Sequence, residues 1–283
     1  MWFQGRYLMY LTLPPGRPAG EGDRWSIGVA ESDDLANWTL SRVLAPFGEY
    51  DARGAAAPGA VVIGDRVHLF FQSYGTGRND AICHASSTDG LSFSGHGDNP
   101  VLRAPLAWSC GRAIDADAVL YGDRVLLAYA TRDPDMKVQM IGTATAAADS
   151  DFGADAWTHL TPHAPALRPE LDWEQDCIEA PALTWDGVRF GMFYAGAYNN
   201  APQQIGWATS PDGVRWERGS TEPVLPVGAP GTWNSSESGH PGVLHHDGRR
   251  HLLFQGNNDH GRTWYIAATP FTLTPTGPAL TWE

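Results

Sequence analysis

Two acidic residues of this chain stand in segments where a charge is hard to accommodate. Asp115 lies in the sequence Ala-Ile-Asp-Ala-Asp-Ala (113–118), and Glu179 lies in Cys-Ile-Glu-Ala-Pro (177–181). An unpaired charge among apolar residues is costly, so these two carboxyl groups are candidates for chemistry. Two carboxyl groups that face a polyhydroxylated ligand can cleave a glycosidic bond. One protonates the leaving oxygen, and a neighbouring negative charge raises the pKa of such an acid.

Polar side chains also gather in segments that follow or precede apolar runs. Planar amides, arginines, carboxylates and aromatic rings that converge on a pocket suit a ligand covered in hydroxyl groups. For any single loop the better interpretation is that Asn and Gly form a turn, but four such loops together favour a binding site. The candidate ligand contacts are Arg78, Asp80, Trp108, Arg132, Asp133, Asn199, Asn200, Asn258 and Arg262.

His240 stands in a comparable segment, Ser-Glu-Ser-Gly-His-Pro (236–241). A lone histidine in such a place is more often a packed or hydrogen-bonded group than a metal ligand. Its assignment as a ligand of a metal or of water therefore needs support from outside the segment itself.

The elements that position these residues are repeated along the chain. A turn with a glycine, usually an arginine, and a following apolar run occurs five times, with steps of 59, 58, 65 and 61 residues between Gly5, Gly64, Gly122, Gly187 and Gly248. A second element, Ile-Gly-x-Ala or a variant of it, keeps the same period and begins at Ile27, Ile82, Ile141, Ile205 and Ile266. Two markers with one period indicate a repeat architecture.

Each repeat contains four short apolar runs separated by Asp-Gly or Gly-Asp turns, which predicts four antiparallel strands. The chain is therefore predicted to be all-β, a single five-bladed β-propeller domain over 1–283 with four antiparallel strands per blade. The expected blades are approximately 1–46, 55–105, 112–168, 177–225 and 238–283. A β-sandwich is the alternative, but it gives no reason for five equal periods.

An antiparallel meander also assigns sides to the chain. The residues before the first strand and after the second strand of each blade meet at one end, so the candidate site residues are expected at a common funnel. The Gly-Asp-Arg and Asp-Gly-x-x-Trp turns belong to the opposite face or the periphery, where their acids are expected to be solvated turn residues.

Composition excludes several classes of function. The net charge is -13 and Lys137 is the single lysine, which argues against binding nucleic acid or acidic lipid. The three cysteines have no CxxC spacing and fit neither a disulfide scaffold nor a zinc site. The N-terminus lacks a basic region and a cleavage site, so it is read as neither a signal peptide nor a membrane span, and a cytoplasmic location is expected.

Four segments in order resemble motifs of a known family. They are 56–61 (Ala-Ala-Pro-Gly-Ala-Val), 114–119 (Ile-Asp-Ala-Asp-Ala-Val), 178–181 (Ile-Glu-Ala-Pro) and 239–240 (Gly-His). They resemble segments of glycoside hydrolase family 43 and its relatives in families 32, 62, 68 and 117, all five-bladed propellers. The resemblance implies that Glu179 is the general acid, that Asp115 orients it and modulates its pKa, and that His240 ligates a central calcium ion or water cluster.

The resemblance further implies a glycosidase that acts on an oligosaccharide or glycoside with arabinose, xylose or fructose units. The resemblance implies that such an enzyme requires no cofactor, apart from a structural calcium ion at the propeller axis. Ala57 lacks the preceding tryptophan of the family and Ala116 replaces its usual proline, so fine substrate subsites do not carry over.

The family's catalytic base is an aspartate at the head of the first inner strand, a point upstream of Met1. We expect that the start is misassigned or trimmed. In the first alternative, another carboxylate such as Asp51 has taken over the role. In the second, the protein is a sugar-binding propeller without catalysis.

Overall fold

The computed structural model describes residues 1–16 and 23–282, and in this part of the chain twenty strands form five antiparallel sheets of four strands each. Strands that follow one another in sequence are neighbours in every sheet. The prediction of an all-β, five-bladed propeller is confirmed. No helix of the described residues is long and apolar enough to cross a membrane.

The five blades follow one another in chain order. Their strands are β1 (Trp2–Phe3), β2 (Arg6–Leu13), β3 (Ser26–Ser32), β4 (Thr39–Val43); β5 (Ala55–Ile63), β6 (Arg66–Ser73), β7 (Ile82–Ser87), β8 (Ser94–Gly95); β9 (Ile114–Tyr121), β10 (Arg124–Arg132), β11 (Gln139–Ala147), β12 (Thr158–His159); β13 (Ile178–Trp185), β14 (Phe190–Gly196), β15 (Gln204–Ser210), β16 (Glu217–Arg218); β17 (Glu237–His246), β18 (Arg249–Asn257), β19 (Tyr265–Thr274) and β20 (Gly277–Leu280). Three 3₁₀ turns, η1 (Gly77–Asn79), η2 (Ala154–Ala156) and η3 (Asp172–Glu174), lie in the connections.

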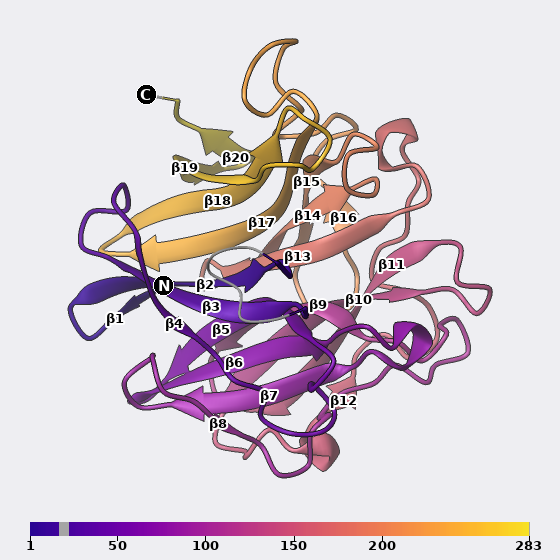
Figure 1. The fold of residues 1–283 in the computed structure, drawn as a ribbon. Helices are drawn as coiled ribbons and strands as arrows, with labels where there is room; N and C mark the ends of the chain where they lie inside the picture. Colours follow the sequence, from indigo (N-terminus) through magenta and orange to yellow (C-terminus); the bar gives the residue numbers. More distant parts are fainter. Residues whose placement is uncertain (17–22, 283) are drawn as a thin grey trace.

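The innermost strands surround the propeller axis (Figure 1). β9 contacts β5 on one side and β13 on the other, β13 contacts β17, and β17 contacts β1 of the first blade. Apolar clusters fill the space between adjacent blades. Phe70 and Tyr129 belong to the cluster between the second and third blades, Tyr194 to the next, and Phe254 to the cluster between the fourth and fifth. Burial of these side chains holds each blade against its neighbours.

The repeated glycine of the Ile-Gly-x-Ala element has a packing cause in two blades. Gly142 pairs with Tyr129 across β10 and β11, and Gly206 pairs with Tyr194 across β14 and β15. A Cβ atom would lie 2.7 Å from the Tyr129 ring at Gly142 and 2.4 Å from the Tyr194 ring at Gly206. Glycine is therefore required because the tyrosine ring of the adjacent strand crosses the position.

The innermost strands of blades two to five share one irregularity near their heads. Each contains a register shift and a residue in the left-handed region, with φ of 46° at Ala57, 50° at Asp115, 48° at Ala180 and 43° at His240. This conformation is uncommon for residues other than glycine. Its recurrence makes the four positions structurally equivalent, so Asp115 and His240 occupy matching places in their blades.

The first blade has a short innermost strand. Trp2 pairs with Tyr7 and Phe3 with Arg6, while the backbone of Met1 exchanges two hydrogen bonds with Leu8. β2 continues to Leu13, and in the described part of the chain its pairing strands are β1 and β3.

The acidic turns are built as the sequence predicts. Asp34 accepts the backbone N–H groups of Ala36 and Asn37, and Asp89 accepts those of Leu91 and Ser92. The N–H groups favour the ionised form, and the pKa of Asp34 is lowered chiefly by Asn37. These carboxylates stabilise turns and have no part in the funnel.

Candidate active site

Asp115 and Glu179 lie at the heads of β9 and β13, the innermost strands of adjacent blades, and are only 8% and 7% exposed. The backbone N–H of Asp115 donates to Oε1 of Gln72 on β6 over 2.8 Å. Burial, and then the negative charge of Glu179, raise the pKa of Asp115 to about 6. The charge of Glu179 therefore acts on Asp115, which keeps its proton to a higher pH than a solvated aspartate would.

Two glutamine side chains hold the carboxylate of Glu179. Nε2 of Gln139 donates to Oε2, and Nε2 of Gln203 donates to Oε1 over 2.8 Å. The thiol of Cys177 also faces Glu179, and burial raises the pKa of this thiol, which stays protonated. Each oxygen of Glu179 thus has an amide donor, and its orientation in the funnel is defined.

His240 joins this cluster from the fifth blade. Its Nδ1 lies 2.9 Å from Oε1 of Gln203 and 2.8 Å from Nε2 of Gln255, and its Nε2 lies 3.9 Å from Oε1 of Glu179. Both Nε2 hydrogens of Gln203 are used, on Glu179 and on the carbonyl of Ala197. Oε1 of Gln203 must therefore accept, whereas Nε2 of Gln255 can only donate, so the two contacts of Nδ1 call for opposite protonation states of this ring nitrogen.

The ring nitrogens of His240 face polar groups of the protein. Its nearest polar partners are two amides and one carboxylate oxygen. Among residues 1–16 and 23–282, no group of three or more His, Cys, Asp or Glu side chains is arranged to hold a metal. In the described part of the chain, the His, Cys, Asp and Glu side chains around His240 therefore do not form a metal site by themselves.

Sequence reasoning did not single out two further acids of the innermost strands, the buried Glu237 and the partly buried Asp117. Glu237 is fully buried, accepts Nε2 of Gln255 and the backbone N–H of Asn200 over 2.7 Å each, and has a pKa raised by burial. Asp117 accepts the backbone N–H of Leu183 over 2.7 Å, and burial raises its pKa to about 7. Both residues stand within segments that already contained a candidate, at the heads of β17 and β9.

The structure brings some of the predicted ligand contacts to this cluster. Arg132 donates from Nε to Oε1 of Gln139 over 2.9 Å, and its guanidinium group lies 5.3 Å from the centre of the Tyr198 ring. The backbone of Asn200 holds Glu237. Asn199 and Asn258 are exposed in the loops that follow β14 and β18.

Other predicted contacts are engaged with the protein itself. Asp80 is buried in an ion pair with Arg112, 3.1 Å apart, and Asp133 accepts backbone N–H groups in its own loop. Arg78 donates to the carbonyl of Pro134, Trp108 to that of Thr161, and the exposed Arg262 follows Asp259 in a turn. Asp51, the alternative base, accepts the backbone N–H groups of Phe47 and Gly48.

A signal for the two glutamines was present in the repeat. Gln139 and Gln203 each precede the Ile of the Ile-Gly-x-Ala element by two residues, at Ile141 and Ile205. A position-by-position comparison of blades would have placed them at the funnel end of the third strand, beside the heads of the innermost strands.

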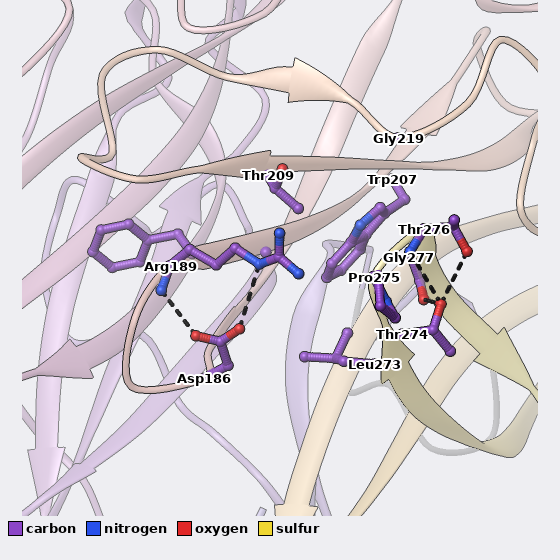
Figure 2. A pocket seen from close by; sticks show the side chains of 12 residues that line it. Asp186, Arg189, Trp207, Thr209, Gly219, Leu273, Thr274, Pro275, Thr276 and Gly277 are labelled. Atoms are coloured by element: carbon purple, nitrogen blue, oxygen red, sulfur yellow. Dashed lines mark hydrogen bonds and ion pairs between the residues drawn. The ribbon is translucent and has the colours of Figure 1, made fainter.

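A cavity of about 200 Å³ lies elsewhere, between the fourth and fifth blades at the end opposite the funnel (Figure 2). Its polar groups bond to one another: Asp186 accepts the backbone N–H of Arg189 and pairs with its side chain, and Thr274 Oγ1 donates to the carbonyl of Gly277. The cavity contains no pair of buried carboxyl groups, so the cluster at the funnel is the better candidate active site.

No family model and no curated protein matches the sequence. Solved structures do match its fold. A thermostable family-43 glycoside hydrolase is 18% identical over 100% of this chain and 91% of its own, with a TM-score of 0.77. An endo-1,4-β-xylanase from Bacteroides thetaiotaomicron is 20% identical over 99% and 94%, with a TM-score of 0.76. An α-L-arabinofuranosidase from Lactobacillus brevis is 18% identical over 96% and 91%, with a TM-score of 0.69. This chain has the five-bladed propeller fold of those glycoside hydrolases.

Proposed function

We propose that the protein is a glycoside hydrolase that cleaves furanoside or pentoside linkages of arabinose, xylose or fructose units. The observation that carries this proposal is the coupled, buried pair of Asp115 and Glu179 at the heads of adjacent innermost strands. The xylanase and arabinofuranosidase that share the fold support the substrate class, although function resides in the site rather than the fold.

In the proposed reaction Glu179 is the general acid and protonates the leaving oxygen of the glycosidic bond. Asp115 modulates that proton through the charge coupling between the two groups. Cleavage follows a single displacement with inversion, in which a second carboxylate about 6.5–9.5 Å from Glu179 activates a water molecule. The resemblance implies an aspartate at the head of the first innermost strand for that role.

The test is hydrolysis of arabino-, xylo- and fructo-oligosaccharides, with the anomer of the first product followed by NMR. The expected result is release of a monosaccharide or short product of inverted configuration by the wild type and its loss in Glu179→Gln. Retained turnover in this variant would remove the acid assignment.

A second candidate is a sugar-binding propeller without catalysis. The observation that favours it is that Asp51, the alternative base, is committed to the backbone N–H groups of Phe47 and Gly48. Calorimetry with the same oligosaccharides separates the two functions: binding without product on long incubation supports this candidate and contradicts hydrolysis.

A further inference from the structure

Gln139 lies between Arg132 and the candidate acid Glu179 and is hydrogen bonded to both. Arg132 donates to its Oε1, and its Nε2 donates to Glu179. We infer that Gln139 is a positioning residue that aims Glu179 at the leaving oxygen, and that Arg132 acts through Gln139 and not as a sugar contact. This inference rests on the proposed function.

The orientation of the Gln139 amide is unique. A guanidinium group can only donate hydrogen bonds, so the oxygen of the amide must face Arg132 and the NH₂ group must face Glu179. Gln139 is buried, and a flipped amide would set N–H groups against Arg132 and an oxygen against a carboxylate. The side chain therefore transmits the position of Arg132 to Oε2 of Glu179.

The backbone of Gln139 reinforces this link. Its N–H donates to the carbonyl of Asp176 over 2.9 Å, and Gln139 forms a parallel bridge with Cys177. The segment that leads into Glu179 is thus fixed to β11 by main chain and side chain together, so the carboxyl group has little freedom to leave the funnel.

The neutral amide also has a chemical consequence. A direct contact with Arg132 would stabilise the ionised form of the carboxyl group and oppose its use as a proton donor. The amide orients the group without supplying a full charge. Arg132 in turn packs its guanidinium group over the ring of Tyr198 and lies near the carbonyl of Met136, which anchors it between the third and fourth blades.

Gln203 holds the other oxygen of Glu179, and its neighbour Gln204 offers a matched control. Gln203 and Gln204 are neighbours, but Gln204 accepts the backbone N–H of Val227 over 3.3 Å and Gln203 donates to Glu179. Gln204→Met therefore removes an amide of the same size near the site without removing a donor to the acid.

The test compares Gln139→Met, Gln203→Met and Gln204→Met on two kinds of substrate. Cleavage of an unactivated oligosaccharide needs protonation of the leaving oxygen. In a 2,4-dinitrophenyl glycoside the leaving group is dinitrophenolate, which departs without being protonated. We expect Gln139→Met and Gln203→Met to lower kcat on both substrates, by a factor that is about 10–100 times larger for the oligosaccharide than for the aryl glycoside. KM should change little. Gln204→Met should change neither. An equal loss on both substrates, or no loss, would overturn the inference.

A double-mutant cycle tests the part played by Arg132. If Arg132 acts through Gln139, Arg132→Met lowers kcat on the oligosaccharide in the wild type but adds no further loss to Gln139→Met. If Arg132 instead contacts the sugar, Arg132→Met raises KM by the same factor in both backgrounds. That result would contradict the inference that Arg132 acts through Gln139.

A crystallographic comparison separates failure of this inference from failure of the proposed function. A wild type that is inert on every glycoside contradicts the hydrolase proposal. The positioning of Glu179 is still decided by crystal structures of the wild type and Gln139→Met. A carboxyl group that leaves its wild-type position supports the inference, and one that keeps it overturns the inference.

Discussion

Gln203 donates a 2.8 Å hydrogen bond from Nε2 to Oε1 of Glu179, although the two residues are 24 positions apart in the sequence. Gln139 reaches the other oxygen of the same carboxyl group from the neighbouring blade. Glu179 is therefore oriented by side chains at the third strands of two blades. Its chemistry can be separated by mutation from the interactions that only support the fold.

Glu179→Gln should abolish most of the turnover while sugar binding remains. The variant keeps the size of the side chain but cannot donate an acidic proton, so kcat should fall about 10²–10⁴-fold. Steady-state kinetics measures the loss and calorimetry measures the binding. Glu217→Gln, on the exposed residue of β16, is the control and should be unchanged.

Asp115→Asn should stabilise the protein at high pH and lower its activity. In the folded state the pKa of Asp115 is raised from 3.8 to about 6, so the folded state binds more protons than the unfolded state between these values. Stability therefore falls as pH rises through that window. The Asp115→Asn variant does not have this loss. Its Tm should exceed that of the wild type at pH 8, and the difference in Tm should shrink towards pH 4. A difference that is independent of pH would contradict the argument, and Asp65→Asn in an exposed turn is the control.

Glu174→Gln should destabilise the fold without a specific effect on chemistry. Glu174 is fully buried and accepts Nε of Arg218 over 2.8 Å and the hydroxyl of Tyr194 over 2.7 Å. Removing one partner of a buried ion pair costs about 3–5 kcal/mol, which urea unfolding would measure. Glu170 pairs with the same arginine but has a side chain 60% exposed, so Glu170→Gln should cost less than about 1 kcal/mol. Equal costs would show that burial does not set the difference.

Treatment with a chelator should leave Tm and activity unchanged. The ring nitrogens of His240 face two amides and Glu179, and the described residues offer no set of three metal-ligating side chains. Thermal unfolding before and after dialysis against EDTA, with calcium then restored, checks this. A rise in Tm on adding calcium back would show that a metal does bind.

Much of the fold could be predicted because its causes are local. The turn glycines and the Ile-Gly-x-Ala element recur at one period, and each blade repeats the same strand pattern, so five blades follow from the sequence. The position of a residue at the head of an innermost strand follows from the same pattern. This is why Asp115 and Glu179 could be placed at one funnel from the sequence pattern alone.

The chemical state of each polar residue could not be predicted in this way. Asp80 and Asp115 both stand at the funnel end of a strand, yet Asp80 is paired with Arg112, 32 residues away, while Asp115 faces the charge of Glu179. Which partner a carboxyl group meets depends on how the blades pack, and the sequence pattern does not contain that information.

The sequence by itself determined the five-bladed propeller, its funnel end and the position of the two candidate acids at that end, because strand periodicity and turn chemistry are properties of short segments. The tertiary structure decided that Gln139 and Gln203 hold Glu179, that Arg132 reaches it through an amide, and that Glu237 joins the cluster. Hydrogen bonds and pKa values depend on contacts between blades and on burial, so they are fixed only when the blades have closed around the axis.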